Sequence, residues 1–509
     1  MADVMSLKKN ILGNYISQIY ITLIGIAIVP LYLKYMGAEA YGLVGFFAML
    51  QAWFSLLDMG LTPTMARETA RFKGGATDAL HYRRLVRALE GVFLIVALVG
   101  GGALFLLSDL IAHKWLKANI LPISEIAISL NIMAIIVAMR WMGGLYRGVI
   151  NGAEKLVWLS TFNSAVATLR FIGVLPVLII VDSSPITFFQ YQLIVAVIEL
   201  TGLALKAYKI FPVLSINQPV RWAWLPLKPV LKFSLTIAFT SCVWVIVTQT
   251  DKLVLSKILS LADYGYFTLA VLVASGIMVV SGPISSAIMP RMANLEAQGR
   301  HDELIALYRK STQFVVVLAG AAVTTLALGA EPLLYAWTGN IELAKEVAPI
   351  LSLYTLGNGI LVIAAFPYYM QYAKGDLSLH LVGNAIFIVL LVPTIVLVAS
   401  EYQGVGAGYV WLGMNLLSFV AWIPLVHRKF EPGLNIRWYL NDILFIAIPI
   451  ILSGILINRF IPHSESRLYL ISQYAIFGVL LLAVGCLASS MIRERFKRFI
   501  TKREWKCIT

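Results

Sequence analysis

The fold is decided by two apolar runs near the start of the chain, which read NILGNYISQIYITLIGIAIVPLYLKYMGAEAYGLVGFFAMLQAWFSLLDMGLT over residues 10–62. A helix needs roughly 20 apolar residues to cross the hydrocarbon core of a bilayer. Residues 10–34 and 41–62 both meet this length, and only a short segment separates them. The stretch therefore predicts two consecutive membrane-spanning helices.

The same pattern continues along the whole chain of 509 residues. Hydrophobic residues make up 60% of the sequence and charged residues 13%, and the mean hydropathy is +0.83. A soluble domain carries about 25% charged residues, so this composition excludes an ordinary soluble enzyme. We expect an all-α, polytopic integral membrane protein with about 14 transmembrane helices. The predicted spans are 10–34, 41–62, 88–108, 123–147, 157–181, 185–205, 233–257, 264–288, 312–336, 347–371, 378–399, 404–426, 440–461 and 468–491.

The loops between these spans carry an uneven distribution of basic residues. With the N-terminus placed in the cytoplasm, thirty lysines and arginines fall inside and seven outside. The positive-inside rule therefore predicts a multi-pass membrane protein with both termini cytoplasmic, including a basic tail over 493–509. The net charge of +14 follows from this bias. It indicates orientation and attraction to anionic lipids rather than binding of nucleic acid.

The chain also repeats itself at an offset of 223 residues. Each repeat holds six spans, an even number, so the two halves share one orientation. We expect two six-helix lobes, residues 1–215 and 216–430, related by a pseudo-twofold axis around a central cavity, with two additional helices over 431–492. The matching pairs are Lys34 and Lys257, Tyr41 and Tyr264, Gly42 and Gly265, Tyr146 and Tyr369, and Gly152 and Gly375.

Three arginines lie inside predicted spans or at their ends. A charge in the middle of a span costs about 2.5–3.5 kcal/mol, so it needs a partner, water or a function. Arg140 and Arg147 are seven residues apart, which places them on one helix face about 10 Å apart. Guanidinium groups bind phosphate with two parallel hydrogen bonds, so this face favours a pyrophosphate. Equally, Arg140 could pair with a neighbouring helix and Arg147 could anchor the interface, while Arg170 faces either an aqueous cavity or a buried ion pair.

The seventh predicted span contains Asp251 and Lys252. Adjacent positions on a helix do not face each other, so we expect that these two charges do not simply neutralise one another. Lys252 continues a polar stripe that is typical of a cavity wall. Asp251 is a candidate for binding a coupling proton or sodium ion, or for pairing with a base of the other lobe, and Asp58 is a second ion-coupling candidate. Glu90 and Glu199 lie near cytoplasmic span ends, where we expect no functional role.

No cofactor chemistry is indicated. The three cysteines and six histidines are dispersed, so no metal site is predicted. The sequence has no GxxxxGK[ST] motif, so we expect no hydrolysis of ATP by the chain itself.

Several stretches resemble bacterial polysaccharide transporters, the Wzx-type flippases of the multidrug/oligosaccharidyl-lipid/polysaccharide superfamily. The resemblance covers roughly residues 10–430 and is carried by NYISQIYITLIGIAIVPLYLKYMGAEAYGLVGFFAMLQAWFSLLDMGLTPTMARETAR at 14–71, YRGVINGAEK at 146–155, TQTDKLVLSKI at 248–258 and YGYFTLA at 264–270.

This resemblance implies a MATE-like fold and a transporter rather than an enzyme. The implied cargo is polyprenyl (undecaprenyl)-pyrophosphate-linked oligosaccharide. It would move from the inner to the outer leaflet of the bacterial inner membrane, for O-antigen or another surface polysaccharide. A polysaccharide polymerase and chain-length proteins are conceivable partners, and the chain is expected to function as a monomer.

Two alternatives remain open. A cation-coupled multidrug or metabolite exporter of the same superfamily would favour a cavity rich in carboxylates, whereas the charges here are mostly basic. A membrane polymerase or glycosyltransferase usually carries its reactive groups in a sizeable loop, and the longest loops here have about 25 residues.

Overall fold

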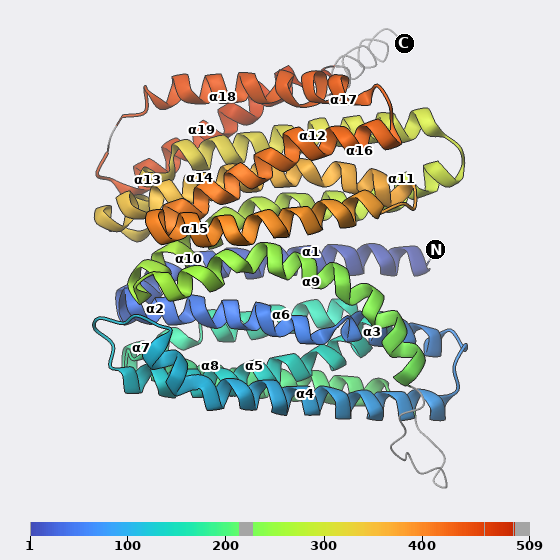
Figure 1. The fold of residues 1–509 in the computed structure, drawn as a ribbon, viewed down its shortest axis with the longest axis vertical. Helices are drawn as coiled ribbons and strands as arrows, with labels where there is room; N and C mark the ends of the chain where they lie inside the picture. The colour runs from blue at the N-terminus through green and yellow to red at the C-terminus, as the bar shows by residue number, and fades with distance from the viewer. Residues whose placement is uncertain (1, 213–226, 463, 492, 494–509) are drawn as a thin grey trace, which may run out of the picture. The chain divides into compact units, whose positions relative to one another are not determined.

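The computed structural model describes residues 2–212, 227–462, 464–491 and 493, and within them it contains helices and no β-strand. Figure 1 shows the helices in chain order. The first ten are α1 (Ala2–Ala27), α2 (Val29–Phe54), α3 (Leu61–Lys73), α4 (Ala79–Lys114), α5 (Ile123–Gly152), α6 (Leu156–Phe171), α7 (Val174–Ile180), α8 (Pro185–Ile210), α9 (Leu227–Ile258) and α10 (Leu261–Ser275). The others are α11 (Ser281–Ala297), α12 (His301–Leu328), α13 (Ala330–Thr338), α14 (Ile341–Ala373), α15 (Ser378–Leu417), α16 (Ile423–Phe430), α17 (Leu434–Arg437), α18 (Phe445–Asn458) and α19 (Arg467–Ala488).

The all-α membrane fold predicted from the sequence is confirmed. Within the described residues, eleven helices are long and apolar enough to cross a membrane by length and composition. One of them, Ser378–Phe430, has 53 residues and includes the stretch predicted to form two spans. The number of fourteen spans, the lobe boundaries and the symmetry between the lobes stay predictions.

Helix boundaries follow from local chemistry. Asp78 precedes α4, and its carboxylate accepts hydrogen bonds from the backbone N–H groups of Leu80 and His81 at 3.0 and 3.3 Å. Ser184 and Pro185 begin α8 in the same way, with a side-chain acceptor followed by a proline at the first helical position. Gly37 has a φ of +83°, which breaks the helical geometry inside α2 between the first two predicted spans.

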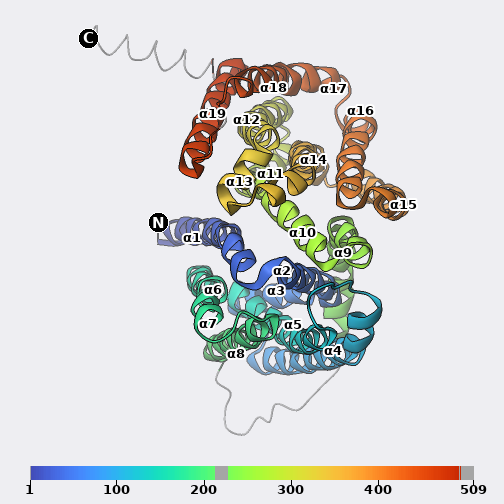
Figure 2. The same ribbon diagram turned by 90° about the vertical axis from the view of Figure 1, so that its left-hand side faces the viewer.

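The chain divides into two compact units, Met1–Thr268 and Leu269–Thr509. In the first unit, α5 packs against α3, α4 and α8, and α1 packs against α6. Figure 2 shows these helices nearly end-on. Their shared core includes Leu89, Phe93, Trp141, Leu145 and Leu203.

The second unit is built around α12 and α14. α12 packs against α14, α18 and α19, and α14 packs against α15. The buried core of this unit includes Tyr308, Phe366, Trp438, Ile450 and Phe477.

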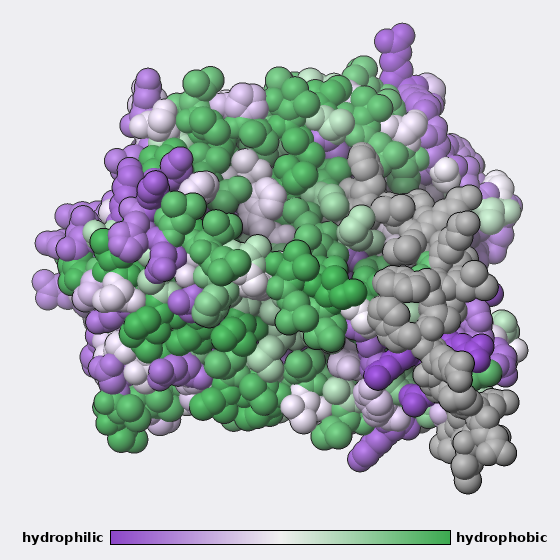
Figure 3. All heavy atoms as spheres, turned by 60° about the horizontal axis from the view of Figure 1, so that its bottom comes forward, coloured by the Kyte–Doolittle hydropathy of each residue, from purple (hydrophilic) through white to green (hydrophobic). Residues whose placement is uncertain are grey.

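Many large apolar side chains point outward. On α4, Leu98, Val99 and Leu106 are 66%, 67% and 82% exposed. Figure 3 shows hydrophobic residues across the middle of one face and hydrophilic residues gathered toward its ends. Such a distribution is typical of helices that contact lipid along their length and reach water at their ends.

Candidate functional site

Three arginines of the first unit converge on one buried carboxylate, that of Glu199 on α8. Arg170 of α6 donates through Nη2 to Glu199 Oε2 at 2.7 Å. Arg147 of α5 donates through Nη2 to the other oxygen, Oε1. Arg140, two turns earlier on α5, lies with Nε 3.8 Å from Oε2. The structure therefore brings together all three arginines that the sequence singled out.

Neutral side chains accept further hydrogen bonds from two of these guanidinium groups, those of Arg140 and Arg147. Gln51 and Gln192 accept hydrogen bonds from Arg140 Nη1 and Nη2 at 2.7 and 3.2 Å. Asn163 accepts one from Arg147 Nη1 at 2.7 Å. The Arg140 guanidinium also lies over the ring of Phe47, 5.2 Å from its centroid.

Helix geometry explains why these groups meet. Positions seven apart on α5 lie on one face, and that face packs against α8. Gly143 lies between the two arginines, and a Cβ atom there would lie 3.2 Å from Leu203 of α8. The missing side chain lets the two helices approach closely, so that arginines of α5 reach Glu199.

The charges of this cluster do not balance. Three guanidinium groups surround one carboxylate. Among the described residues, the other side chains that accept hydrogen bonds from them are neutral amides. The side chains of Arg147 and Arg170 are 30% and 26% exposed, whereas that of Glu199 is 5% exposed. The excess positive charge is therefore the accessible part of the cluster, and it suits an anion with more than one negative charge.

Sequence reasoning discounted Glu199, which is the centre of the cluster. The predicted sixth span ends at residue 205, which placed Glu199 close to the interface, but α8 continues to Ile210. Sequence reasoning also gave no role to the amides Gln51, Gln192 and Asn163. An uncharged polar side chain points to a site only when the residue that it contacts is known.

Asp251 and Lys252 lie together on α9, apart from the arginine cluster. Lys252 Nζ lies 3.1 Å from Asp251 Oδ1 and donates to the carbonyl oxygen of Thr248 at 2.7 Å. The expectation that these neighbours do not neutralise one another was therefore wrong. The lysine side chain is long enough to fold back along the helix, although the two Cβ atoms diverge.

Asp58 and Glu90 occupy separate positions. Asp58 accepts hydrogen bonds from the backbone N–H and hydroxyl of Thr62, at 3.2 and 2.6 Å. Glu90 accepts from the hydroxyls of Tyr146 and Tyr208 and from Arg87. Among the described residues, no group of three or more His, Cys, Asp or Glu side chains could hold a metal ion.

Comparison with known proteins gives a family match and a fold match. A family model described as "Polysaccharide biosynthesis protein" matches residues 7–296. A Shigella flexneri protein named "Putative O-antigen transporter" is 21% identical over 293 residues, which cover 57% of this chain and 68% of that protein. A Salmonella typhi protein of the same name is 23% identical over 290 residues, covering 56% and 65%.

Two solved structures show the fold. The lipid II flippase MurJ in an inward closed conformation aligns with a TM-score of 0.71 and 14% identity, over 92% of this chain and 97% of that one. An inward-facing multidrug resistance MATE family transporter of the MOP superfamily aligns with a TM-score of 0.66 and 15% identity, over 80% and 96%.

Proposed function

Since this chain belongs to the polysaccharide biosynthesis protein family, we propose that it is a flippase for lipid-linked glycans. The proposed cargo is an undecaprenyl-pyrophosphate-linked oligosaccharide, which moves from the inner to the outer leaflet of a bacterial inner membrane. The names of the two relatives and the fold shared with MurJ and MATE transporters support a transporter rather than an enzyme.

The observation that carries the proposal is the arginine cluster around Glu199. A pyrophosphate brings several negative charges, and two partly exposed arginines, Arg147 and Arg170, offer forked donors to it. Arg140 is mostly buried and holds the cluster in place through Gln51 and Gln192. We assign pyrophosphate binding to these three arginines acting together.

In this scheme Glu199 competes with the cargo. The carboxylate occupies donors that the pyrophosphate also requires, so binding of the cargo must loosen some of the ion pairs. Glu199 keeps the arginines ordered when no cargo is bound. Its competition also lowers the affinity of the site for the cargo, which allows the cargo to be released on the other side. Alternating access between the two lobes then carries the head group across while the polyprenyl chain stays in lipid.

Lys252, Asp251 and Asp58 have the secondary roles in this proposal. Lys252 attracts the anionic head group from α9, and Asp251 binds a coupling proton or sodium ion, with Asp58 as the other candidate. Asp251 is 3% exposed and paired with Lys252, so binding of a cation to Asp251 would compete with the lysine.

Asp251→Asn should remove any dependence of transport on pH, measured in vesicles. An unchanged pH profile would remove Asp251 from the coupling scheme.

A multidrug or metabolite exporter is the second candidate, because MATE transporters share the fold. The charges of the site argue against it. Organic cations would be repelled by three arginines that surround one carboxylate.

The experiment that tests the function is deletion of the gene in its host, followed by extraction of lipid-linked sugars. We expect accumulation of polyprenyl-pyrophosphate oligosaccharide and loss of the matching surface polymer. A normal lipid-linked pool together with new sensitivity to cationic drugs would favour the exporter.

Complementation of that deletion tests the site. Arg140→Ala and Arg147→Ala should fail to restore the surface polymer at normal levels of inserted protein. Arg300→Ala, which removes a 51% exposed arginine paired with Glu303, should restore it and serves as the matched control. Full restoration by Arg147→Ala would exclude the proposed role of the cluster.

A further inference from the structure

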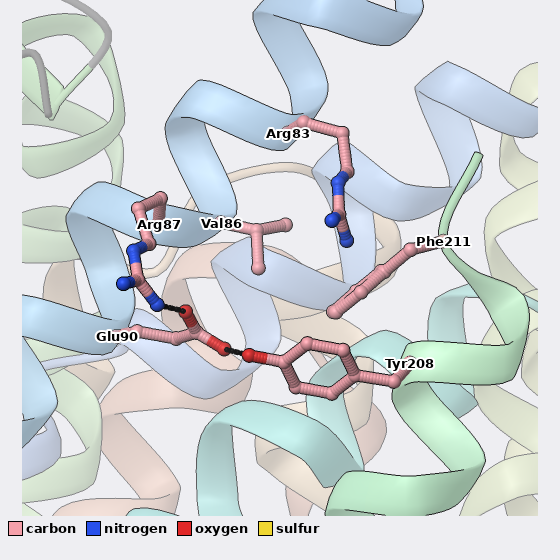
Figure 4. A pocket seen from close by; sticks show the side chains of 6 residues that line it. All are labelled: Arg83, Val86, Arg87, Glu90, Tyr208 and Phe211. Atoms are coloured by element: carbon pink, nitrogen blue, oxygen red, sulfur yellow. Dashed lines mark hydrogen bonds and ion pairs between the residues drawn. The ribbon is translucent and has the colours of Figure 1, made fainter. Parts of the chain in front are cut away.

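A second basic site lies near the start of α4, in a pocket between α4 and the end of α8 (Figure 4). The pocket has a volume of about 230 Å³. This volume lies below the ~300–1,000 Å³ of pockets that hold drug-sized ligands, so it suits a small head group. None of the proposed cargo-binding arginines lines it. The lining residues are Arg83, Val86, Arg87, Glu90, Tyr208 and Phe211.

The pocket combines an apolar floor with basic side chains. Val86 and Phe211 are 2% and 7% exposed and form the apolar part. Arg83 and Arg87 are one turn apart on α4, so both reach the same pocket. Two like charges at this spacing repel each other. Their arrangement is therefore stable only where a carboxylate or another anion compensates the positive charge.

The carboxylate of Glu90 compensates one of these charges. Its Oε2 accepts a hydrogen bond from Arg87 Nη1 at 3.3 Å, and its Oε1 accepts from the hydroxyls of Tyr208 and Tyr146 at 2.8 and 3.3 Å. Figure 4 shows Arg87 and Tyr208 reaching Glu90 from opposite sides. Both oxygens of Glu90 are therefore engaged within the pocket wall.

Arg83 supplies the remaining positive charge. Its guanidinium lies over the Phe211 ring, 5.0 Å from the centroid, and among the described residues it forms no ion pair with a carboxylate. Figure 4 shows it directed toward Phe211. The ring holds the planar group in position while its N–H donors stay available to an acceptor.

The position of the pocket along the helices indicates which class of anion it would bind. The pocket lies where α4 begins and α8 ends. The sequence around these helix ends carries six basic residues over 67–87 and five over 206–232. The positive-inside rule assigns these basic segments to the cytoplasmic side, where the leaflet is rich in anionic lipids. Basic pockets between membrane helices on that side are suited to phosphate head groups.

We infer that this pocket binds the phosphate of an anionic phospholipid, with Arg83 as the principal ligand and Phe211 as the platform that orients it. The apolar floor accommodates the glycerol end of the lipid, and Tyr208 closes the side toward the interface. The site is separate from the cargo-binding cluster, so it can be occupied while the protein is empty of cargo.

The test measures the melting temperature of the purified full-length protein in detergent. Short-chain phosphatidylglycerol, short-chain phosphatidylcholine and inorganic phosphate are titrated separately against wild type, Arg83→Gln and Arg83→Lys. Arg71→Gln is the matched control, because it removes a 48% exposed arginine of α3 from the same side of the unit.

We expect phosphatidylglycerol to stabilise wild type and Arg71→Gln at similar concentrations. Arg83→Gln should need roughly fivefold more lipid, since one basic residue near an anionic surface contributes about that factor. Arg83→Lys should also weaken the response, because a lysine keeps the charge without the forked geometry.

Three outcomes would overturn the inference. An equal response of wild type and Arg83→Gln would exclude Arg83 as a ligand. An equal loss in Arg71→Gln would show that only the surface charge matters. Full stabilisation by inorganic phosphate alone would show that the pocket takes the free ion and not a lipid.

Discussion

At the scale of single residues, the physical problem is a carboxylate held away from water among three arginines. Glu199 is 4% exposed, so it loses most of its hydration on folding. Three nearby positive charges offset that loss. The converse also holds, because Glu199 is the one carboxylate among the described residues that pairs with these three arginines.

Replacing Glu199 should therefore have two measurable effects. Glu199→Gln leaves buried guanidinium groups uncompensated, which should lower the free energy of unfolding by about 3–5 kcal/mol. It also removes the competing anion, so inorganic pyrophosphate should raise the melting temperature of this variant more than that of wild type. Both effects are measured by thermal unfolding in detergent with and without pyrophosphate.

The control is Glu303→Gln, which removes a 56% exposed carboxylate paired with the 51% exposed Arg300. It should change stability little, because exposed pairs contribute weakly. If pyrophosphate stabilises the two variants equally, the cluster around Glu199 is not an anion site.

The site could be predicted from the sequence only in part. Arg140, Arg147 and Arg170 stand out because a charge within an apolar run is costly. Glu199 does not stand out in the same way, since its importance comes from arginines 29 to 59 positions away on other helices. Lys252 was misjudged because helix periodicity describes Cβ directions and not the reach of a long side chain.

At the scale of helices, α2 and α10 approach closely at two glycines that match in the predicted repeat. A Cβ atom on Gly42 would lie 2.0 Å from the carbonyl oxygen of Leu261, and one on Gly265 would lie 2.8 Å from that of Ala38. Gly42 and Gly265 are a matching pair of the repeat, and so are Ala38 and Leu261. The contact is therefore reciprocal with respect to the predicted repeat, while the twofold axis itself stays a prediction.

Gly42→Ala tests this contact. The added methyl group meets backbone atoms that cannot move aside, so we expect a loss of about 1–3 kcal/mol in stability. The measurement is the melting temperature of the purified variant. Gly265→Ala should follow the same trend with a smaller loss, since its Cβ has more room.

Gly102→Ala is the control, because a Cβ there would meet nothing within 4 Å. It should leave stability unchanged or raise it slightly, as alanine favours helix over glycine. If Gly42→Ala and Gly102→Ala melt at the same temperature, the close approach of α2 and α10 is not tight in solution.

The helices beyond the repeat are attached to α12 by a buried polar network. Asp442 lies in the π-helix η4 (Trp438–Leu444) and is 0% exposed. It accepts from Arg309 Nε at 2.6 Å and from Gln313 Nε2 at 2.7 Å. Gln313 Oε1 in turn accepts from Ser489 Oγ at 2.9 Å, so η4 and the end of α19 meet at one point of α12.

Asp442→Ala should therefore destabilise the second unit by about 3–5 kcal/mol, because it leaves Arg309 without its carboxylate partner. The double variant with Arg309→Met should recover part of this loss. Thermal unfolding of the single and double variants measures the coupling. Asp376→Ala breaks an exposed pair with Lys429 and should change little; an equal effect of both single variants would show that the network does not hold η4 to α12.

The helices themselves could largely be predicted, because an apolar run of sufficient length has few other options in a bilayer. Their extensions beyond the membrane could not. α4 begins at Ala79, ahead of the predicted span start at residue 88, since Asp78 provides its N-cap in water. The π-helix η4 depends on packing that a hydropathy pattern does not contain.

At the scale of the whole molecule, the number of spans decides the topology. An even number places both termini on one side, and an odd number separates them. The helix Ser378–Phe430 would be about 80 Å long if straight. The hydrocarbon core is roughly 30 Å thick, so we predict two passes for this helix, with the break at Gln403, which has a φ of +53°. The helices Ala2–Ala27 and Leu227–Ile258 lie outside the eleven candidates and are long enough to span.

The basic loops predict an even number of spans, and labelling of single cysteines tests this prediction. In a background that keeps only Cys507, or only an introduced Ile120→Cys or Ala76→Cys, a membrane-impermeant maleimide is applied from the periplasmic side. Ile120 is 85% exposed in the loop between α4 and α5, so Ile120→Cys should react at once. Ala76→Cys and Cys507 should react only after the inner membrane is opened, because both belong to segments that the positive-inside rule retains in the cytoplasm. Immediate labelling of Cys507 while Ala76→Cys stays protected would mean that an odd number of spans separates the two positions. The prediction that both repeats share one orientation and that the tail lies in the cytoplasm would then be wrong.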